Sequence, residues 1–184
     1  IFGGALSISS VEDLIYPALF VIAGFIAILS HEMGHALVGR RLGGGQQTIV
    51  LELFGGLTSS HGMQLTRGGR ALMILAGPMM TLLLGIISLW LTWNIVAPVM
   101  ASHNLDFWDL AISPFTAALI SPKLYILSCL IMIGEWWTLL NLLPIYPLDG
   151  GQLIAQYIRS PRKVFMTGFI TAILIGLFSF QFFH

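Results

Sequence analysis

Residues 15–39 read IYPALFVIAGFIAILSHEMGHALVG, and this stretch decides the fold class. Its first half is almost wholly apolar, whereas its second half carries the polar run HEMGH at 31–35, and Arg40 and Arg41 follow. About 20 predominantly apolar residues are enough for a helix to cross the hydrocarbon core of a bilayer. The sequence therefore predicts a first transmembrane helix at about 14–38.

The composition of the whole chain also indicates a membrane protein. Of its 184 residues, 57% are hydrophobic and only 9% are charged, and the mean hydropathy is +0.90. A soluble domain carries about 25% charged residues, so this chain is not an ordinary soluble domain. The net charge of zero provides no positive field for binding nucleic acid. The high hydrophobicity excludes an intrinsically disordered chain.

Three further apolar stretches have the length of a membrane span, and they lie at about 71–97, 124–148 and 164–183. We expect Pro98 to end the second span and Pro144 and Pro147 to break the third, because proline removes a backbone donor. The predicted fold class is an all-α polytopic membrane protein with about four transmembrane helices, forming one domain over 1–184. The chain opens with Ile1, and its first apolar run is too long for a signal peptide, so we expect no cleavable targeting segment.

The segment between the first two spans reads QQTIVLELFGGLTSSHGM at 46–63 and has the composition of β-structure. Its β-branched residues and leucines predict two strands, and Gly55-Gly56 is a turn signal, so we expect a hairpin at about 47–60. A lone hairpin is only marginally stable in water, so this one is expected to associate with the helices or the membrane.

The distribution of lysine and arginine predicts the orientation in the membrane. Along a four-span path, seven basic residues fall on one side: Arg40, Arg41, Arg67, Arg70, Arg159, Arg162 and Lys163. Lys123 alone falls on the other side, so the seven-residue side is expected to be cytoplasmic. The loop at about 99–122 and both termini are then expected to face outward. We expect a multi-pass protein of a prokaryotic plasma membrane.

The run at 31–35 follows the H-E-x-x-H pattern of zinc hydrolases. His31 and His35 are four residues apart and project from one helical face, so both imidazoles can bind one Zn²⁺, and Glu32 lies beside them to polarise a bound water. His35 precedes Arg40 by about 8 Å of helix, which puts the cluster near the border of the hydrocarbon. The other interpretations are a buried structural ion pair and a polar cluster in headgroup water.

A catalytic zinc site normally has three protein ligands, so a third residue is needed. The candidates are Glu52, His61, His103, Asp106, Asp109, Glu135, Asp149 and His184. The predicted topology puts four of them across the membrane from His35, namely His103, Asp106, Asp109 and His184. Asp149 is favoured because it follows the broken end of the third span, at a depth comparable to 31–35. Glu135 is the main alternative, and Glu52 and His61 in the hairpin region are further ones.

Two motifs together give the sequence a family resemblance. HEMGHALVGRRLG at 31–43 and NLLPIYPLDGGQL at 141–153, with FGGLT and AGP between them, resemble the site-2 protease family of zinc intramembrane metalloproteases. The resemblance implies that His31, His35 and Asp149 bind one Zn²⁺. It also implies that Glu32 is the catalytic glutamate and that Asn141 positions the substrate or stabilises the reaction centre.

The chain departs from the family pattern at two polar positions. Relatives often have Asn three residues after the proline of AGP, where this chain has Thr81. In the third span this chain has Gly134, followed by Glu135, where relatives often have Asn. These differences affect secondary polar contacts and leave the expected zinc ligands in place.

The resemblance implies a zinc endopeptidase that cleaves in or near the transmembrane segments of single-pass membrane proteins, in regulated intramembrane proteolysis. The expected partners are that substrate and the lipid bilayer, and no nucleic acid. A helical substrate must unwind before cleavage, and the hairpin at about 47–60 offers an edge strand to which it can add, unless the hairpin only plugs the cytoplasmic mouth. The competing class is a non-hydrolytic metal-binding or transport protein, but the sequence shows no repeated halves.

Overall fold

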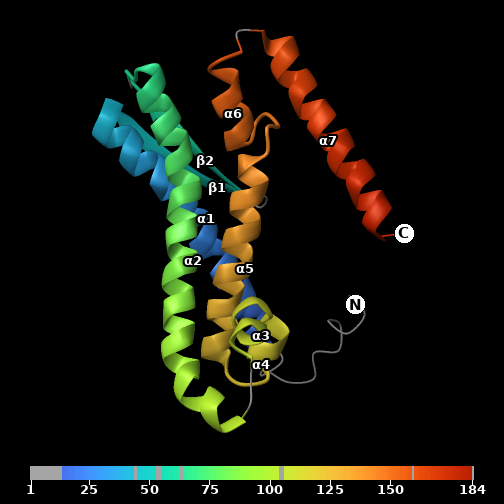
Figure 1. Ribbon diagram of the computed structural model, residues 1–184. Helices are drawn as coiled ribbons and strands as arrows, with labels where there is room; N and C mark the ends of the chain where they lie inside the picture. Colours follow the sequence, from blue (N-terminus) through green and yellow to red (C-terminus); the bar gives the residue numbers. More distant parts are fainter. Residues whose placement is uncertain are drawn as a thin grey trace. The chain divides into compact units, whose positions relative to one another are not determined.

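The computed structural model describes residues 14–43, 45–52, 55–62, 64–103, 106–158 and 160–183 (Figure 1). In chain order, the helices and strands are α1 (Ile15–Gly43), β1 (Gln46–Glu52), β2 (Gly55–His61), α2 (Arg67–His103), α3 (Phe107–Ile112), α4 (Pro114–Ala118), α5 (Pro122–Leu142), α6 (Asp149–Ala155) and α7 (Pro161–Phe183).

Three helices within the described residues are long and apolar enough to cross a membrane: α1, α2 over Arg67–Ala97, and α5. The prediction of a mostly helical membrane protein is confirmed. The fourth predicted span, at about 164–183, overlaps α7, and its crossing of the membrane stays a prediction.

Prolines act differently in α2 and after α5. The second candidate span ends at Ala97, directly before Pro98, whereas helix α2 continues through Pro98 to His103. An interior proline removes one hydrogen bond of the helical ladder, and a long helix tolerates that loss. After α5 the prediction holds, since helix ends at Leu142 and the chain is non-helical until Asp149. The third apolar stretch is therefore helical over a shorter range than 124–148.

Contacts group the chain into two compact units. The first takes in α1 up to Leu29 together with Leu82–Glu135, and its apolar core contains the buried residues Ala23, Cys129, Leu130, Val96, Leu110, Ala117 and Leu124. The second takes in Ser30–Thr81 and the chain from Trp136 onward. That the whole chain is one domain stays a prediction.

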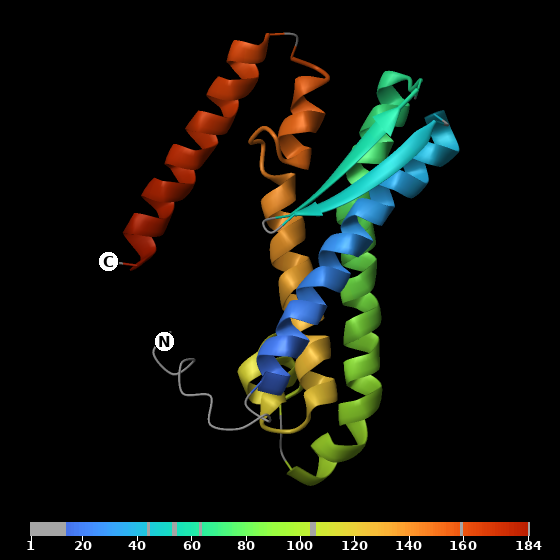
Figure 2. The same cartoon turned by 180° about the vertical axis from the view of Figure 1, so that it is seen from behind.

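In the second unit, β1 and β2 form a two-stranded antiparallel sheet beside the later turns of α1 (Figure 2). The pairs run from Gln46 opposite His61 to Glu52 opposite Gly55. The turn expected at Gly55-Gly56 is wrong, because both glycines belong to β2 and pair with Glu52 and Leu51. Glycine accepts extended backbone as readily as turn backbone, so the signal is not specific. The connection itself, at 53–54, lies outside the described residues.

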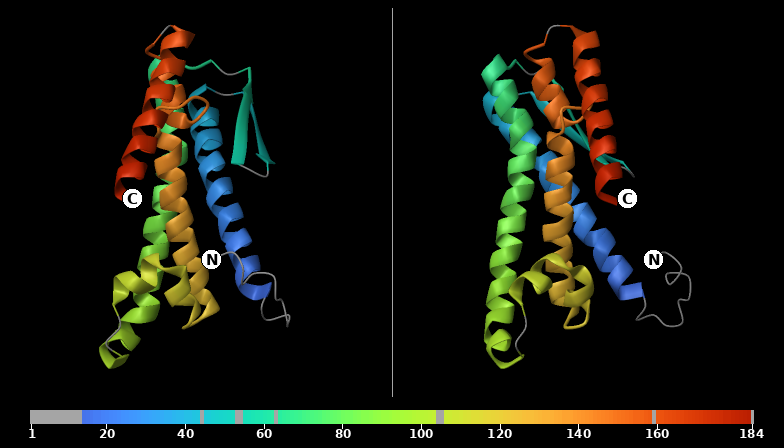
Figure 3. Two further views of the ribbon diagram at one scale, coloured as in Figure 1. Left: turned by 90° about the vertical axis from the view of Figure 1, so that its right-hand side faces the viewer. Right: turned by 45° about the vertical axis from the view of Figure 1, so that its right-hand side comes forward.

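The chain reverses between α5 and α6, and two glycines make the reversal compact. A Cβ at Gly150 would overlap the carbonyl oxygen of Leu142, and a Cβ at Gly151 would overlap the backbone of Ile145. Glycine is required at both positions because the start of α6 lies directly against the reversal. In α7, Gly168 lies against Ile145, so α7 runs alongside α6 and the reversal (Figure 3).

Candidate metal centre

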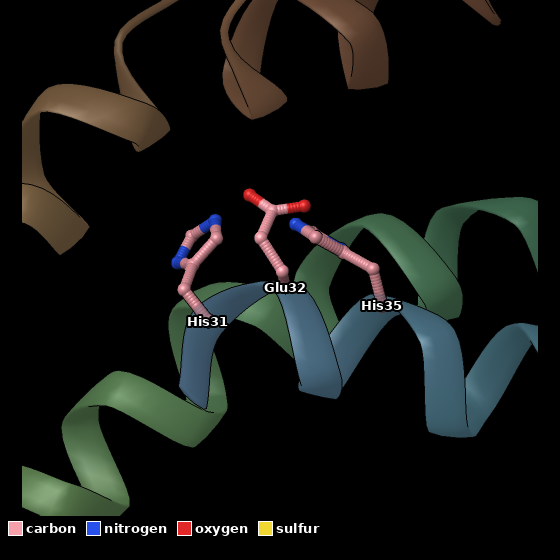
Figure 4. Close-up of side chains that lie close together, drawn as sticks. All are labelled: His31, Glu32 and His35. Carbon is pink, nitrogen blue, oxygen red and sulfur yellow. The ribbon is translucent and has the colours of Figure 1, made fainter. Parts of the chain in front are cut away.

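Three polar side chains project from one side of α1 in the second unit (Figure 4). His31, Glu32 and His35 are all buried, with exposed fractions of 2%, 5% and 8%. One ligand atom from each lies within 4.8 Å of the other two, so the three form a group that can hold a metal ion. Their shared helical face follows from the spacing in the sequence.

A second carboxylate reaches the same place from α6. Oδ2 of Asp149, the first residue of α6, lies 2.9 Å from Nε2 of His31 and 3.3 Å from Nε2 of His35. Ligand atoms of a tetrahedral zinc ion are about 3.3 Å apart, because each lies about 2.0–2.2 Å from the metal. The two distances from Asp149 to the imidazoles are therefore within a few tenths of an ångström of the spacing between zinc ligands.

One ring nitrogen of His35, Nδ1, is directed away from this centre. Its Nδ1 donates a hydrogen bond of 2.9 Å to the backbone carbonyl of Met73 on α2. A neutral imidazole held in this way carries its proton on Nδ1 and keeps the lone pair of Nε2 for a metal. The carbonyl of Met73 thus selects the tautomer that a zinc ligand needs.

Two glycines bring α1 and α2 together at the centre. A Cβ at Gly34, between the two histidines, would overlap the carbonyl oxygen of Ala76. A Cβ at Gly77 would overlap Nε2 of His35 and would lie 2.8 Å from Nε2 of His31. Small residues allow helix backbones to approach closely in membrane proteins, and here they allow α2 to form one wall of the site.

Asp149 lies outside the three spanning helices, and its surroundings favour the charged form. Burial raises the pKa of this carboxyl, but hydrogen bonds with His31 and His35 and their charges outweigh burial, so the pKa is lowered from its ordinary value. An ionised carboxylate is the form that binds a divalent cation.

Among the described residues, the group that can hold a metal ion includes none of the other candidate ligands of the sequence. Glu135 is exposed on α5. Asp106 caps α3, and Asp109 is exposed on the same helix. Asn141 donates through Nδ2 to the carbonyl of Trp137 on its own helix, at 3.0 Å. The side chains of Glu52, His61, His103 and His184 lie outside the described part of the chain.

The sequence analysis did not predict three structural features of this unit. Gly77 belongs to the AGP motif, which was noted without a role, and Met73 contributes only its backbone carbonyl. A buried hydroxyl pair is the third, since Thr81 Oγ1 on α2 and Thr138 Oγ1 on α5 lie 2.7 Å apart. The only signal for this pair was the departure from the family pattern at Thr81.

The sequence is similar to known zinc metalloproteases. The sequence model of Peptidase family M50 matches residues 19–182. A zinc metalloprotease of Methanocaldococcus jannaschii is 25% identical over 181 residues, which are 94% of this chain and 46% of that protein. Rip3 of Mycobacterium tuberculosis is 31% identical over 132 residues, which are 72% of this chain and 29% of that protein. The chain thus spans less than half the length of these relatives. No solved structure gives a significant match.

Proposed function

The chain belongs to peptidase family M50, and on this basis we propose that it is a zinc-dependent endopeptidase that hydrolyses peptide bonds in or near the transmembrane segments of single-pass membrane proteins. The observation that carries the proposal is the convergence of two imidazoles from α1 and one carboxylate from α6, whose oxygen lies 2.9 and 3.3 Å from the two Nε2 atoms. A protein that only binds or transports a metal has no need for a further buried carboxylate beside the ligands, and Glu32 is such a group.

The four side chains have separate roles in this proposal. His31, His35 and Asp149 hold the zinc, and Glu32 is the general base. When bound, Zn²⁺ lowers the pKa of a water molecule and polarises the scissile carbonyl. Glu32 takes a proton from the attacking water and delivers it to the leaving amine. Because Glu32 and Asp149 both carry carboxylates near the imidazoles, the assignment of ligand and base is the part that most needs a test.

Asn141 is proposed to hold the substrate. One N–H of its amide is engaged by the carbonyl of Trp137. An asparagine amide has a second N–H and a carbonyl oxygen, and these remain for the backbone of an extended substrate or for the oxygen that becomes negative during hydrolysis.

The proposed membrane arrangement has four spans, including α7, with the metal centre toward the cytoplasm and both termini of 1–184 outside. Arg40 and Arg41 in the last turn of α1 support this sidedness, because basic residues gather on the cytoplasmic side of spanning helices. They also suit the negative end of the helix dipole.

The hairpin is proposed to receive the substrate. A helix in a membrane hides its peptide carbonyls in its own hydrogen bonds, so the substrate must become extended before attack. In a sheet of two strands each strand has one edge free of pairing with the other, and an extended segment can add there. The hairpin belongs to the same compact unit as the metal centre, which supports this role.

The deciding experiment compares Glu32→Gln with Asp149→Asn in the full chain, with zinc content measured by elemental analysis and cleavage by fragment size of co-expressed single-pass proteins. We expect Glu32→Gln to retain one zinc per chain and to lose cleavage by at least about 100-fold, as for removal of a general base. Asp149→Asn should lose both. If Glu32→Gln loses zinc and Asp149→Asn keeps it, the two roles are exchanged. Cleavage by Glu32→Gln at the wild-type rate would contradict the proposed mechanism.

A further inference from the structure

The connection between α2 and α5 forms a compact cap on the first unit, made of α3 and α4 (Figure 1). It was expected to be an outward loop at about 99–122. We infer that this cap lies in the interface between membrane and water, with one apolar face inserted among the lipids of the leaflet at that end of the unit.

The cap carries both buried and exposed apolar side chains. Leu110 and Ala117 are buried in the unit, where they join the core of Val96 and Leu124. Four large apolar residues of the cap are exposed: Trp108 at 59%, Ile112 at 54%, Phe115 at 82% and Leu119 at 88%. Trp108 and Ile112 are four residues apart and lie on one face of α3. Phe115 in α4 and Leu119, which caps the C-terminus of α4 with helical backbone angles, have the same spacing. A loop in water has no reason to expose four such side chains together.

Two polar side chains of the cap, Asp106 and Ser113, form hydrogen bonds with the backbone and a hydroxyl of the cap itself. Asp106 accepts a hydrogen bond from the backbone N–H of Trp108 at 2.9 Å. Ser113 Oγ accepts from the backbone N–H of Thr116 at 3.3 Å and from its hydroxyl at 3.0 Å. Helix ends satisfied in this way tolerate an environment with little water. Asp109 remains exposed, and it gives the cap one charged edge.

Tryptophan and tyrosine gather at this end of the unit. The rings of Trp93 and Phe107 lie 5.2 Å apart, and those of Phe107 and Trp108 lie 5.3 Å apart. Tyr16 donates to the carbonyl of Ala118 at 2.9 Å, and its ring meets that of Tyr125 at 4.9 Å. Such a belt is typical of the level of lipid headgroups, where one end of an aromatic side chain is apolar and the other is wet.

Lipid is the occupant that fits the outer face best. The cap joins two helices that have the length and composition of membrane spans, so its ends must lie at one surface of the bilayer. Exposed apolar side chains at that depth, on helices whose terminal N–H groups already have hydrogen-bond acceptors, are typical of helices that lie in the membrane interface. The inference depends on the membrane-spanning helices and not on the proposed proteolysis.

The test places a fluorescent label at single cysteines of the full chain in lipid vesicles. Cys129 is the one cysteine of the sequence and is buried, so Cys129→Ser provides the background. Phe115→Cys and Leu119→Cys carry the environment-sensitive label NBD, and Asp109→Cys is the matched control on the charged edge. These side chains are exposed, so their replacement removes no core packing. Quenching by spin-labelled phospholipids and by aqueous iodide is then measured.

We expect emission from positions 115 and 119 to shift to the blue and to be quenched at least twofold more strongly by the labelled lipids than emission from position 109. Position 109 should be quenched more strongly by iodide. Equal access of iodide to all three labels would overturn the inference. Protection of 115 and 119 from both quenchers would also overturn it, because a protein surface would then cover this face. Neither readout depends on cleavage or zinc.

Discussion

Oδ2 of Asp149 lies 2.9 Å from Nε2 of His31, although 118 residues separate them in the chain. This contact joins the two motifs that mark the sequence, one in a spanning helix and one at the start of a short helix after a proline-broken reversal. The proposed zinc ligands come from both segments, His31 and His35 from the first and Asp149 from the second. The fold therefore makes the site by bringing the start of α6 onto the polar face of α1.

Asp149→Asn should weaken zinc binding by more than about 100-fold. Loss of a hydrogen-bonding partner behind a ligand costs about 10–100-fold in affinity, and loss of a ligand should cost more. Competition with a fluorescent chelator measures the affinity. Glu135→Gln is the matched control, because Glu135 is an exposed carboxylate on α5 and was the rival ligand in the sequence. Equal zinc affinities of the two variants would remove Asp149 from the ligand set.

Gly77→Ala should impair zinc binding through steric overlap alone. The added Cβ would overlap Nε2 of His35 and press on His31, so both imidazoles must move. Alanine is the better helix former, which excludes a propensity loss as the cause. Gly85→Ala on the same helix is the control, since a Cβ there meets no atom within 4 Å. Wild-type zinc affinity in Gly77→Ala would show that α2 does not form a wall of the metal site.

Much of the metal centre was predictable because its side chains have distinctive chemistry. His31, Glu32 and His35 follow from helical spacing, and Asp149 follows from its place after Pro144 and Pro147. The remaining contributions have no such signature in one sequence. Any residue can supply the carbonyl that Met73 supplies, and the need for glycine at position 77 arises only when two helices meet at a particular height.

The errors of the fold prediction have local causes. Gly55-Gly56 is a turn signal that its context overrides, because glycine also pairs in a strand. Pro98 follows the end of the second candidate span without ending the helix, because a long helix tolerates one missing donor. The short helices α3 and α4 escaped prediction because each has fewer residues than the two or more turns over which helical periodicity becomes visible.

Thr81→Val should destabilise the protein by about 1 kcal/mol, because it leaves the buried hydroxyl of Thr138 without its partner at 2.7 Å. The double variant Thr81→Val/Thr138→Val should be less destabilised than the sum of the single variants, since two apolar groups of the same shape then meet. Unfolding in a mixed detergent gives the four free energies of this cycle. Strict additivity would mean that the hydroxyl pair does not stabilise the contact of α2 with α5.

Proline in the hairpin should reduce cleavage without removing zinc. Backbone N–H groups of a strand alternate between the partner strand and the outer edge. Residues that flank a two-residue connection usually form a hydrogen-bonded pair. Counting from Glu52 and Gly55, we therefore expect the facing residues Ile49 and Thr58 to present their N–H groups outward. Ile49→Pro therefore blocks the outer edge of β1, and Thr58→Pro blocks that of β2. Losing one backbone hydrogen bond to an added strand should lower the cleavage rate about 3- to 10-fold.

Comparison of the two proline variants identifies the strand that receives the substrate, because only the variant of that strand should lose cleavage. Ile49→Ala and Thr58→Ala keep the N–H groups and serve as matched controls, with cleavage expected close to wild type. Zinc content should be unchanged in all four variants, since the hairpin contributes no proposed ligand. Wild-type cleavage by both proline variants would exclude strand addition and favour the hairpin as a plug of the cytoplasmic mouth.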